Sequence, residues 1–341
     1  GMPEFDEMYE KYERKTSISK KKIRAQTLFM DLLKERAETG RIYIMNIDHC
    51  NTHSSFKDKV YMSNLCQEIT LPTKPIKHID DEEGEIALCI LSAVNLGLIK
   101  DKEELEELCD LSVRALEEII DYQKYPVKAA EKSTLARRSL GIGYIGLAHY
   151  LAKNKVKYDD KEAWKLVDEI TEAFQYYLLK SSNTLAKERG ACEYFDKTKY
   201  SDGILPIDSY KKDVDDIVKR KYSYDWTSLR NDIKSSGLRH STLSAQMPSE
   251  SSSVVSNATN GVEPPRDYLS IKKSKKGTLK QIVPDYNRLK NFYTLLWDMK
   301  SNEGYINTIS VMQKYFDQAI SGNWSYNPEN YKDGEVPVSV M

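Results

Sequence analysis

An almost wholly apolar run at residues 42–47, which reads Ile-Tyr-Ile-Met-Asn-Ile, most restricts how this chain can fold. A strand in which polar and apolar residues do not alternate is typical of a parallel sheet covered by helices on both faces. The covering helices are predicted at 103–122 and 161–189 by apolar residues at helical spacing, and Gly190 ends the second one. We therefore expect a single α/β domain over residues 1–341.

Other elements are predicted from spacing and from turn residues. The first forty residues look helical and end at Gly40. A buried helix is expected at 85–96, and residues 63–72 are expected to be part loop and part strand. Further along we expect mixed short helices and turns at 197–239, followed by a short strand at 242–245. A helix is then expected to open in 247–253 and to reach about Thr259. Residues 268–273 and 278–283 are expected to form a hairpin, and apolar positions from 306 to 320 mark a last amphipathic helix.

Composition and cysteine spacing exclude several classes of protein. The formal net charge is -1, so no general electric field favours nucleic acid or an acidic membrane. The longest apolar stretch, 86–99, is too short to cross a bilayer, and no secretory signal opens the chain. The five cysteines are odd in number and widely spaced, without a Cys-x-x-Cys pair: Cys50, Cys66, Cys89, Cys109 and Cys192. We therefore expect a cytoplasmic protein with free thiols and no nucleic-acid or membrane partner.

Three chemically useful side chains alternate near the start of the 63–72 segment. Asn64, Cys66 and Glu68 are two residues apart, so in an extended segment they would point to the same side. An amide can hold a hydroxyl, a carboxylate can take a proton, and a thiol can act as a nucleophile or as a hydrogen-atom donor. The competing interpretation, more common on spacing alone, is a strand with a polar edge and an ordinary core cysteine.

A turn rich in hydroxyl groups, residues 248–252, opens a predicted helix. Ser249 and Ser251–Ser253 crowd the helix start, where free backbone N–H groups and the helix dipole attract anions. Ser249 could equally be a plain N-cap. Glu250 opposes a phosphate site, because its charge would repel phosphate unless the backbone amides outweigh it or the carboxylate points away.

A glycine motif has the spacing of a dinucleotide-binding loop. Gly141, Gly143 and Gly146 fit the pattern Gly-x-Gly-x-x-Gly, but polar and basic residues precede them where a strand is needed. Only Asp159 and Asp160 come near the position of a ribose-binding acid. We interpret these glycines as helix-packing positions.

A short cluster near the N-terminal third has residue types that bind metals. Asp48, His49, Cys50 and His53 lie within six residues, but a four-ligand zinc site needs a further ligand and none is local. We interpret them as hydrogen-bonded loop residues and predict no metal site.

Four segments, in order along the chain, resemble the large catalytic subunit of class I ribonucleotide reductases. They are 40–54 (GRIYIMNIDHCNTHS), 63–75 (SNLCQEITLPTKP), 84–89 (GEIALC), and 243–252 (LSAQMPSESS) continuing to 256–266 (SNATNGVEPPR). The resemblance runs from about residue 4 to the last residue and is nearest to bacterial and bacteriophage enzymes with a separate diiron subunit. It implies an α/β fold that forms the second half of a ten-stranded α/β barrel, with a central finger loop and many surrounding helices.

The resemblance implies a role for each motif. Cys66 would be the transient thiyl radical that takes a hydrogen atom from the ribose 3′ carbon, Glu68 would deprotonate the 3′ hydroxyl, and Asn64 would hydrogen-bond near the 2′ and 3′ hydroxyls. Cys89 would be one of two redox thiols that supply reducing equivalents when the 2′ hydroxyl leaves as water. The resemblance also implies two sets of substrate contacts. The first set is Asn64, Leu65, Cys66, Gln67 and Glu68. The second set, which would hold the diphosphate, is Pro248, Ser249, Glu250, Ser251 and Ser252. Ser251 stands where threonine is usual, and the hydroxyl is kept.

The resemblance also implies partners and a missing remainder. No cofactor would be bound by this chain itself; a diiron-tyrosyl small subunit would supply the radical, and thioredoxin or glutaredoxin the electrons. The substrate would be a ribonucleoside diphosphate. We find no counterpart here of three parts of the family's proteins: the N-terminal ATP-binding domain, the first half-barrel and the C-terminal redox tail. The tyrosine pair that follows the segment 336–341 in the family has no counterpart either. We therefore expect a complementing N-terminal half, or a homodimer, and no turnover by the isolated chain.

Two other interpretations remain at this stage. The chain could be a non-catalytic remnant or interaction module of a reductase, since large parts are missing. The intact Asn64, Cys66 and Glu68 row and the 248–252 turn oppose this interpretation. A cobalamin-dependent reductase of the same barrel type agrees less well, because the matching segments resemble class I throughout.

Overall fold

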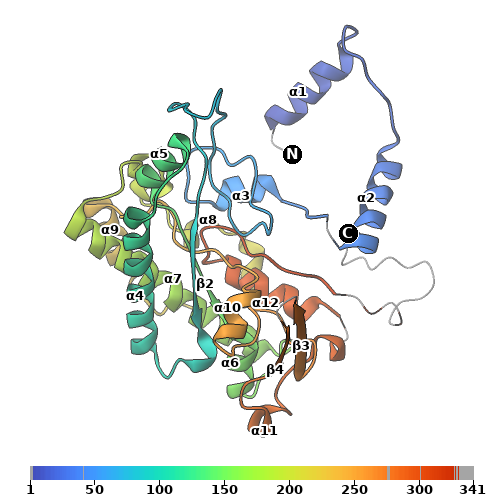
Figure 1. Cartoon of the computed structure of the whole chain (residues 1–341), viewed down its shortest axis with the longest axis vertical. Helices are drawn as coiled ribbons and strands as arrows, with labels where there is room; N and C mark the ends of the chain where they lie inside the picture. Colours follow the sequence, from blue (N-terminus) through green and yellow to red (C-terminus); the bar gives the residue numbers. More distant parts are fainter. Residues whose placement is uncertain are drawn as a thin grey trace.

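Two parallel strands, β1 (Ile90–Asn95) and β2 (Leu140–Ile145), form the centre of the fold (Figure 1). The computed structural model describes residues 3–40, 42–274, 277–299, 301–325, 327 and 329. β2 is buried along its whole length, as expected of a strand with neighbours on both edges. Two short extended segments continue the sheet beyond β2, because Ile142 bridges Ser244 and Gln246 bridges Ile320, both in parallel. The order across the sheet is therefore β1, β2, residues 242–246 and residues 318–321.

A buried carboxylate joins the last two of these segments. Oδ1 of Asp317 accepts hydrogen bonds from the backbone N–H of Ser244 at 2.8 Å and from its hydroxyl at 3.1 Å. Oδ2 accepts from the N–H of Leu243 at 2.9 Å and from the hydroxyl of Tyr200 at 2.7 Å. These donors satisfy a carboxylate that would be costly to bury alone, so side-chain as well as main-chain bonds hold the two segments together.

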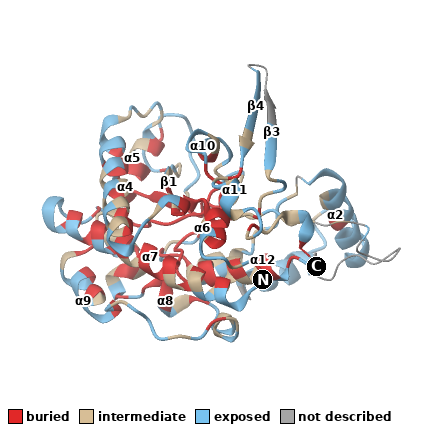
Figure 2. Ribbon diagram, turned by 90° about the horizontal axis from the view of Figure 1, so that it is seen from below, coloured by how far each residue is buried: buried red, intermediate tan, exposed pale blue. Residues whose placement is uncertain are grey.

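The two long helices predicted from the sequence are confirmed. The first is α4 (Lys102–Tyr122), which the Asp101 side chain caps by accepting from the N–H of Glu104 at 2.8 Å. The second is α7 (Lys161–Arg189), which Gly190 ends. α7 is buried on most sides because it packs against α4, α9 (Trp226–Ser236) and α12 (Glu303–Gln313). Figure 2 shows the buried residues gathered around these helices and the sheet.

The remaining elements are shorter. The other helices are α1 (Pro3–Arg14), α2 (Ala25–Thr39), α3 (Ile47–His53), α5 (Lys128–Arg137), α6 (Leu147–Lys153), α8 (Pro206–Ser209), α10 (Glu250–Val255) and α11 (Tyr286–Leu289). Single 3₁₀ turns lie at Leu96–Leu98, Phe195–Lys197, Lys199–Asp202, Lys212–Asp216 and Leu296–Asp298. The mixed character predicted for 197–239 is confirmed, as is the stop at Gly40, which takes a left-handed φ of 63°. The predicted hairpin is confirmed as antiparallel β3 (Leu269–Ser274) and β4 (Gly277–Ile282).

Three predicted elements are wrong, and three others are shorter than predicted. Residues 42–46 have no regular structure and α3 starts at Ile47, because the apolar run finds no strand partner among the described residues. The buried helix expected at 85–96 is instead loop followed by β1, a confusion that periodicity cannot resolve for short apolar runs. Residues 63–72 contain a turn but no strand. The strand expected at 242–245 is reduced to isolated bridges, and α10 and α12 end sooner than predicted, at Val255 and Gln313.

The ten-stranded barrel that the resemblance implies is not formed by the described residues. Their parallel strands make an open sheet, in which β1 pairs only with β2 and leaves its other edge unpaired. Leu91, the second residue of β1, is 43% exposed. The fold is therefore α/β, as expected, with an open edge where a closed barrel would continue.

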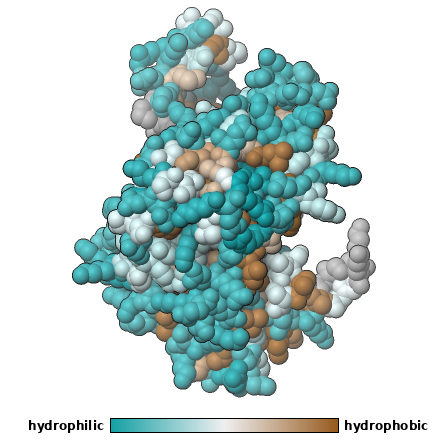
Figure 3. Space-filling view, turned by 90° about the vertical axis from the view of Figure 1, so that its left-hand side faces the viewer, coloured by the Kyte–Doolittle hydropathy of each residue, from teal (hydrophilic) through white to brown (hydrophobic). Residues whose placement is uncertain are grey.

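Two parts of the chain project from the body. α1 and α2 extend away from the sheet (Figure 1), and the β3–β4 hairpin protrudes in a second view (Figure 2). Both carry exposed apolar side chains, such as Phe5 and Leu28 on the helices and Ile271 and Leu279 on the hairpin. The face in Figure 3 is mostly hydrophilic, with apolar side chains in small separate patches. Among the described residues, no helix is long and apolar enough to cross a membrane.

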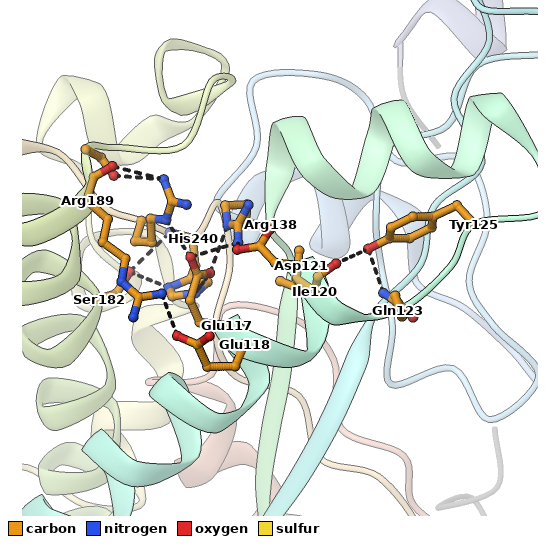
Figure 4. Close-up of polar contacts among 12 residues, drawn as sticks. Glu117, Glu118, Ile120, Asp121, Gln123, Tyr125, Arg138, Ser182, Arg189 and His240 are labelled. Atoms are coloured by element: carbon orange, nitrogen blue, oxygen red, sulfur yellow. Dashed lines mark hydrogen bonds and ion pairs between the residues drawn. The ribbon is translucent and has the colours of Figure 1, made fainter.

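A buried ionic network joins α4 to α7 and to the segment that follows α9 (Figure 4). Glu117 accepts hydrogen bonds from Arg138 Nε at 2.8 Å, Arg239 Nε at 2.6 Å and His240 Nε2 at 3.0 Å. Burial by itself would raise the pKa of Glu117, but the bonds from His240 and Arg138 hold it well below its usual value. Burial lowers the pKa of His240. His240 is therefore neutral, donates from Nε2 to Glu117 and accepts at Nδ1 from the hydroxyl of Ser182 at 2.9 Å.

Replacing Glu117 by Gln is expected to lower the free energy of unfolding by about 3 kcal/mol, because Arg138 and Arg239 would then face a neutral amide inside the core. The matched control is Glu118→Gln, which breaks an exposed ion pair with Arg189 and should cost less than about 0.5 kcal/mol. Urea unfolding followed by circular dichroism measures both. Equal losses in the two variants would show that the buried network contributes no more than a surface pair.

Candidate functional site

The segment that carries Asn64, Cys66 and Glu68 is a tight loop, not the extended row that the spacing predicts. The N–H of Gln67 donates to the Asn64 carbonyl at 3.2 Å, and the N–H of Asn64 donates to the Ile69 carbonyl at 3.3 Å. Gln67 takes a left-handed φ of 65°, which lets the chain reverse. We name residues 63–75 the finger loop. Leu65 lies at its tip and is 81% exposed.

This reversal brings the side chains of Asn64 and Glu68 together. The sequence analysis also placed them on one side, but as members of an extended segment. Asn64 Nδ2 donates to Glu68 Oε1 at 2.8 Å, and Asn64 Oδ1 accepts from the N–H of Ile69 at 3.2 Å. Glu68 is only 3% exposed, and its Oε2 atom has no hydrogen-bond partner within the described part of the chain. A buried carboxylate oxygen without a donor is costly to keep. It is also suited to accept a hydrogen bond or a proton from a ligand hydroxyl.

Cys66 is half-buried and lies within electrostatic range of two acidic side chains. Burial, and then the negative charges of Glu68 and Glu250, raise the pKa of the Cys66 thiol. The thiol therefore stays protonated at neutral pH, which suits a donor of hydrogen atoms better than a thiolate nucleophile. Because Glu250 belongs to the first turn of α10, its influence also means that the serine turn (residues 248–252) lies within electrostatic range of the finger loop.

Cys89 approaches the same loop from the residue before β1. Its half-buried side chain packs against the small apolar cluster that holds Ile69 and Leu71 of the finger loop. Gln318 Nε2 lies 3.9 Å from its sulfur. Burial raises the pKa of the Cys89 thiol strongly, and the charges of Asp317 and Glu68 raise it further. Cys89 and Glu68 are therefore near neighbours, although 21 positions separate them in the sequence.

The glycine motif has a different role from the helix packing that we predicted. Gly141 and Gly143 lie inside β2, and Gly146 precedes α6. A Cβ atom on Gly141 would come within 2.8 Å of the Cys89 sulfur and 3.1 Å of Ile69 Cδ1. Gly141 therefore leaves the space in which the thiol and the finger loop meet the strand.

The serine turn is tied to β2 by a glutamine that the sequence analysis did not single out. Gln246 Nε2 donates to the carbonyls of Tyr144 at 2.9 Å and Met247 at 3.0 Å, and its Oε1 accepts from the N–H of Tyr144 at 3.1 Å. Gln246 is fully buried. A glutamine inside a run of small and apolar residues, just before Met247 and Pro248, is the signal that could have identified it.

The serine turn itself is not closed by an N-cap. Ser249 takes a left-handed φ of 54°, and no side chain caps α10. The Ser249 hydroxyl donates to the Met247 carbonyl at 3.4 Å instead, so the plain N-cap interpretation is wrong. Pro248 is half-buried, while Glu250, Ser251 and Ser252 are exposed. No side-chain cap therefore binds the N–H groups of this first turn.

The remaining sequence-predicted candidates lie elsewhere or outside the described residues. His53 at the end of α3 bonds through Nδ1 to the Ser209 hydroxyl at 3.0 Å and through Nε2 to the Phe316 carbonyl at 2.8 Å. Within the residues that the structure describes, no three His, Cys, Asp or Glu side chains gather as metal ligands do. The segment at 336–341 lies outside the described residues.

Replacing Glu250 by Gln is expected to speed the alkylation of Cys66 about twofold to fourfold near pH 8, because removing a negative charge lowers the pKa of the thiol. Iodoacetamide labelling over a range of pH, read by peptide mass spectrometry, gives the rate at each cysteine. Ser251→Ala changes the same helical turn without changing its charge and should leave the rate unaltered. No acceleration in Glu250→Gln would mean that the serine turn and the finger loop do not form one site.

Comparison with known proteins gives consistent relatives over nearly the whole chain. The family model described as "Ribonucleotide reductase, barrel domain" matches residues 1–336. The chain is 58% identical over 340 residues to the ribonucleoside-diphosphate reductase subunit alpha of Haemophilus influenzae, covering 99% of this chain and 45% of that protein. It is 56% identical to the corresponding Escherichia coli subunit 1 alpha and 44% identical to the subunit alpha of Enterobacteria phage T4, with the same two coverages.

The chain thus spans a little under half the length of the curated relatives that it matches. The match includes the finger loop, Cys89, β2 and the serine turn, all of which lie within residues 1–336. The extent of the family match and the identity to these relatives agree with the resemblance seen in the sequence, and the chain belongs to the ribonucleotide reductase barrel-domain family.

Proposed function

We propose that this chain supplies the radical cysteine and part of the substrate site of a ribonucleoside-diphosphate reductase, which makes deoxyribonucleoside diphosphates for DNA synthesis. One observation carries the proposal: the buried Glu68, held by Asn64, keeps an unpartnered carboxylate oxygen beside the protonated thiol of Cys66. Removal of the 3′ hydrogen from a ribose needs a proton acceptor next to a thiol that can become a thiyl radical, which then accepts the hydrogen atom. The names of the relatives supply the substrate class.

Each residue then has a chemical task. Cys66, as a thiyl radical, takes the hydrogen atom from the ribose 3′ carbon and becomes a thiol. Glu68 takes the proton of the 3′ hydroxyl through its free oxygen, and Asn64 keeps that carboxylate in place while it bonds near the 2′ and 3′ hydroxyls. The 2′ hydroxyl leaves as water, and Cys89 with a second thiol becomes a disulfide, so two electrons pass from sulfur to the sugar. Cys66 finally returns the hydrogen atom to the 3′ carbon.

Substrate binding is assigned to the finger loop, which carries Cys66, and to the serine turn, which lies within electrostatic range of Cys66. Leu65 and Gln67, together with the three reacting residues, would line the ribose in the finger loop. Pro248, Ser249, Glu250, Ser251 and Ser252 would bind the diphosphate through the backbone amides and hydroxyls of the serine turn. Supporting this, the first turn of α10 has no side-chain cap, and its hydroxyl groups at Ser251 and Ser252 are exposed. Glu250 would have to turn away from a bound phosphate.

The finer architecture is also proposed. Residues 1–341 would form one domain and the second half of a ten-stranded barrel, closed by a separate N-terminal half or by a second copy of the chain. The unpaired edge of β1 and the exposed Leu91 favour this, because an open sheet edge binds other strands readily. A diiron-tyrosyl small subunit would supply the radical, and thioredoxin or glutaredoxin would reduce the disulfide.

Mixing this chain with an N-terminal half, a C-terminal tail segment that bears the tyrosine pair, a diiron small subunit and a dithiol is expected to give deoxyribonucleoside diphosphate. Cys66→Ser should lower turnover at least about a thousandfold, because an alkoxyl radical cannot replace the thiyl radical in this step. Cys109→Ala, which alters a fully buried cysteine of α4, is the matched control and should keep most of the activity. Product is measured by liquid chromatography.

Absence of turnover, although the halves are shown to associate by sedimentation, would contradict the catalytic proposal. It would favour the interpretation as an interaction module. Activity with adenosylcobalamin in place of the small subunit would contradict the choice of radical source.

A further inference from the structure

One short segment contacts both the finger loop and the segment that leads to the serine turn. The N–H of Ala319 donates to the Glu68 carbonyl at 3.1 Å, and its own carbonyl accepts from the N–H of Gln246 at 3.1 Å. The N–H of Gln318 donates to the Ser244 carbonyl at 3.1 Å. Residues 317–319 therefore pair with the finger loop on one side and with the strand that leads to the serine turn on the other.

The side chain of Gln318 makes the third connection, to Cys89. Its Nε2 atom donates to the Leu140 carbonyl at 2.8 Å and lies 3.9 Å from the Cys89 sulfur, while its Oε1 atom accepts from the N–H of Thr70 at 3.3 Å. Gln318 is buried, with 3% of its surface exposed. One amide therefore joins β2, the redox cysteine and the finger loop, and both of its polar atoms are used.

The backbone at this joint is held independently. Gln313 Nε2 donates to the Gln318 carbonyl at 2.8 Å and to the Phe316 carbonyl at 3.3 Å. Asp317 fixes the preceding position through its bonds to Leu243 and Ser244. A change in the side chain of Gln318 alone would therefore leave its main chain anchored.

We propose that Gln318 is a positioning residue, which directs an N–H group at the Cys89 sulfur and fixes that thiol against the finger loop. Its contacts do not depend on any activity, but its importance for turnover rests on the proposed function. Neither family role nor spacing pointed to this residue.

The N–H group has an electrostatic effect on the thiol. Burial and the charges of Asp317 and Glu68 all disfavour the Cys89 thiolate, whereas the bond from Gln318 favours it. Gln318 thus offers the sulfur a favourable dipole in a surrounding that otherwise opposes its ionisation. A thiol that must lose its proton when it forms a disulfide would use this help.

A purely structural role predicts the opposite result in an experiment. If Gln318 only fills space, its loss loosens the packing around Cys89 and makes the sulfur more accessible to reagents. If it donates to the sulfur, its loss raises the pKa of the thiol and makes it less reactive. The direction of the change in reactivity therefore separates the two roles.

The test uses two variants of Gln318 and one control in the full chain. Gln318→Met keeps the volume but removes both polar atoms. Gln318→Glu keeps an oxygen for Thr70, removes the N–H donor and adds a carboxylate that also disfavours the thiolate. Gln313→Met removes another glutamine amide, which bonds to the Gln318 carbonyl but to no cysteine that the structure describes. Iodoacetamide labelling between pH 8 and 10, resolved by peptide mass spectrometry, follows each cysteine.

We expect labelling of Cys89 to slow about threefold to tenfold in both Gln318 variants, with the rate-against-pH curve moved to higher pH. Gln313→Met should leave it within about twofold, and the core cysteines Cys109 and Cys192 should stay unreactive in all three variants. Any other pattern, including unchanged or faster labelling of Cys89 in Gln318→Met, overturns the proposal. Because labelling needs no substrate or partner, failure of the complementation assay would not affect this outcome.

Discussion

The buried carboxylate of Asp317 is the interaction on which the candidate site depends. It binds the N–H groups of Leu243 and Ser244 and the hydroxyl of Tyr200, and so joins residues 242–246 to residues 317–321. The first of these segments leads to the serine turn, and the second carries Gln318 and Ala319 beneath the finger loop. Together with the main-chain bonds between these segments, this carboxylate gives the finger loop and the serine turn a common support. The site is thus built on side-chain amides and carboxylates inside the core as much as on the sheet.

Much of the fold was predictable where the pattern is long and local. The helices at 102–122 and 161–189, the stop at Gly40 and the hairpin follow from spacing and from turn residues. Short apolar runs led to wrong predictions of secondary structure, because a run such as 42–47 becomes a strand only if another strand lies beside it. Which segments become neighbours is decided by contacts between distant residues, and those are not visible in local periodicity.

The candidate site was predictable as a set of residues but not as a geometry. Asn64, Cys66 and Glu68 were selected for an extended row, yet they meet through a turn closed by Gln67 and Ile69. The roles of Gln246 and Gln318 stayed hidden because their partners, Tyr144 and Thr70, lie about one hundred and two hundred and fifty positions away. The interpretation of Gly141 as a helix-packing position was wrong, since its missing side chain makes room for the Cys89 sulfur and not for a helix or a nucleotide.

The acidic surroundings of the two site cysteines have a consequence for their survival in an oxidising cell. Peroxides attack thiolates, and a thiol with a raised pKa holds little thiolate at neutral pH. Cys66, beside Glu68 and Glu250, and Cys89, beside Glu68 and Asp317, are therefore slow to form sulfenic acid. The burial and the negative charges that keep the hydrogen on sulfur also protect both residues from irreversible oxidation.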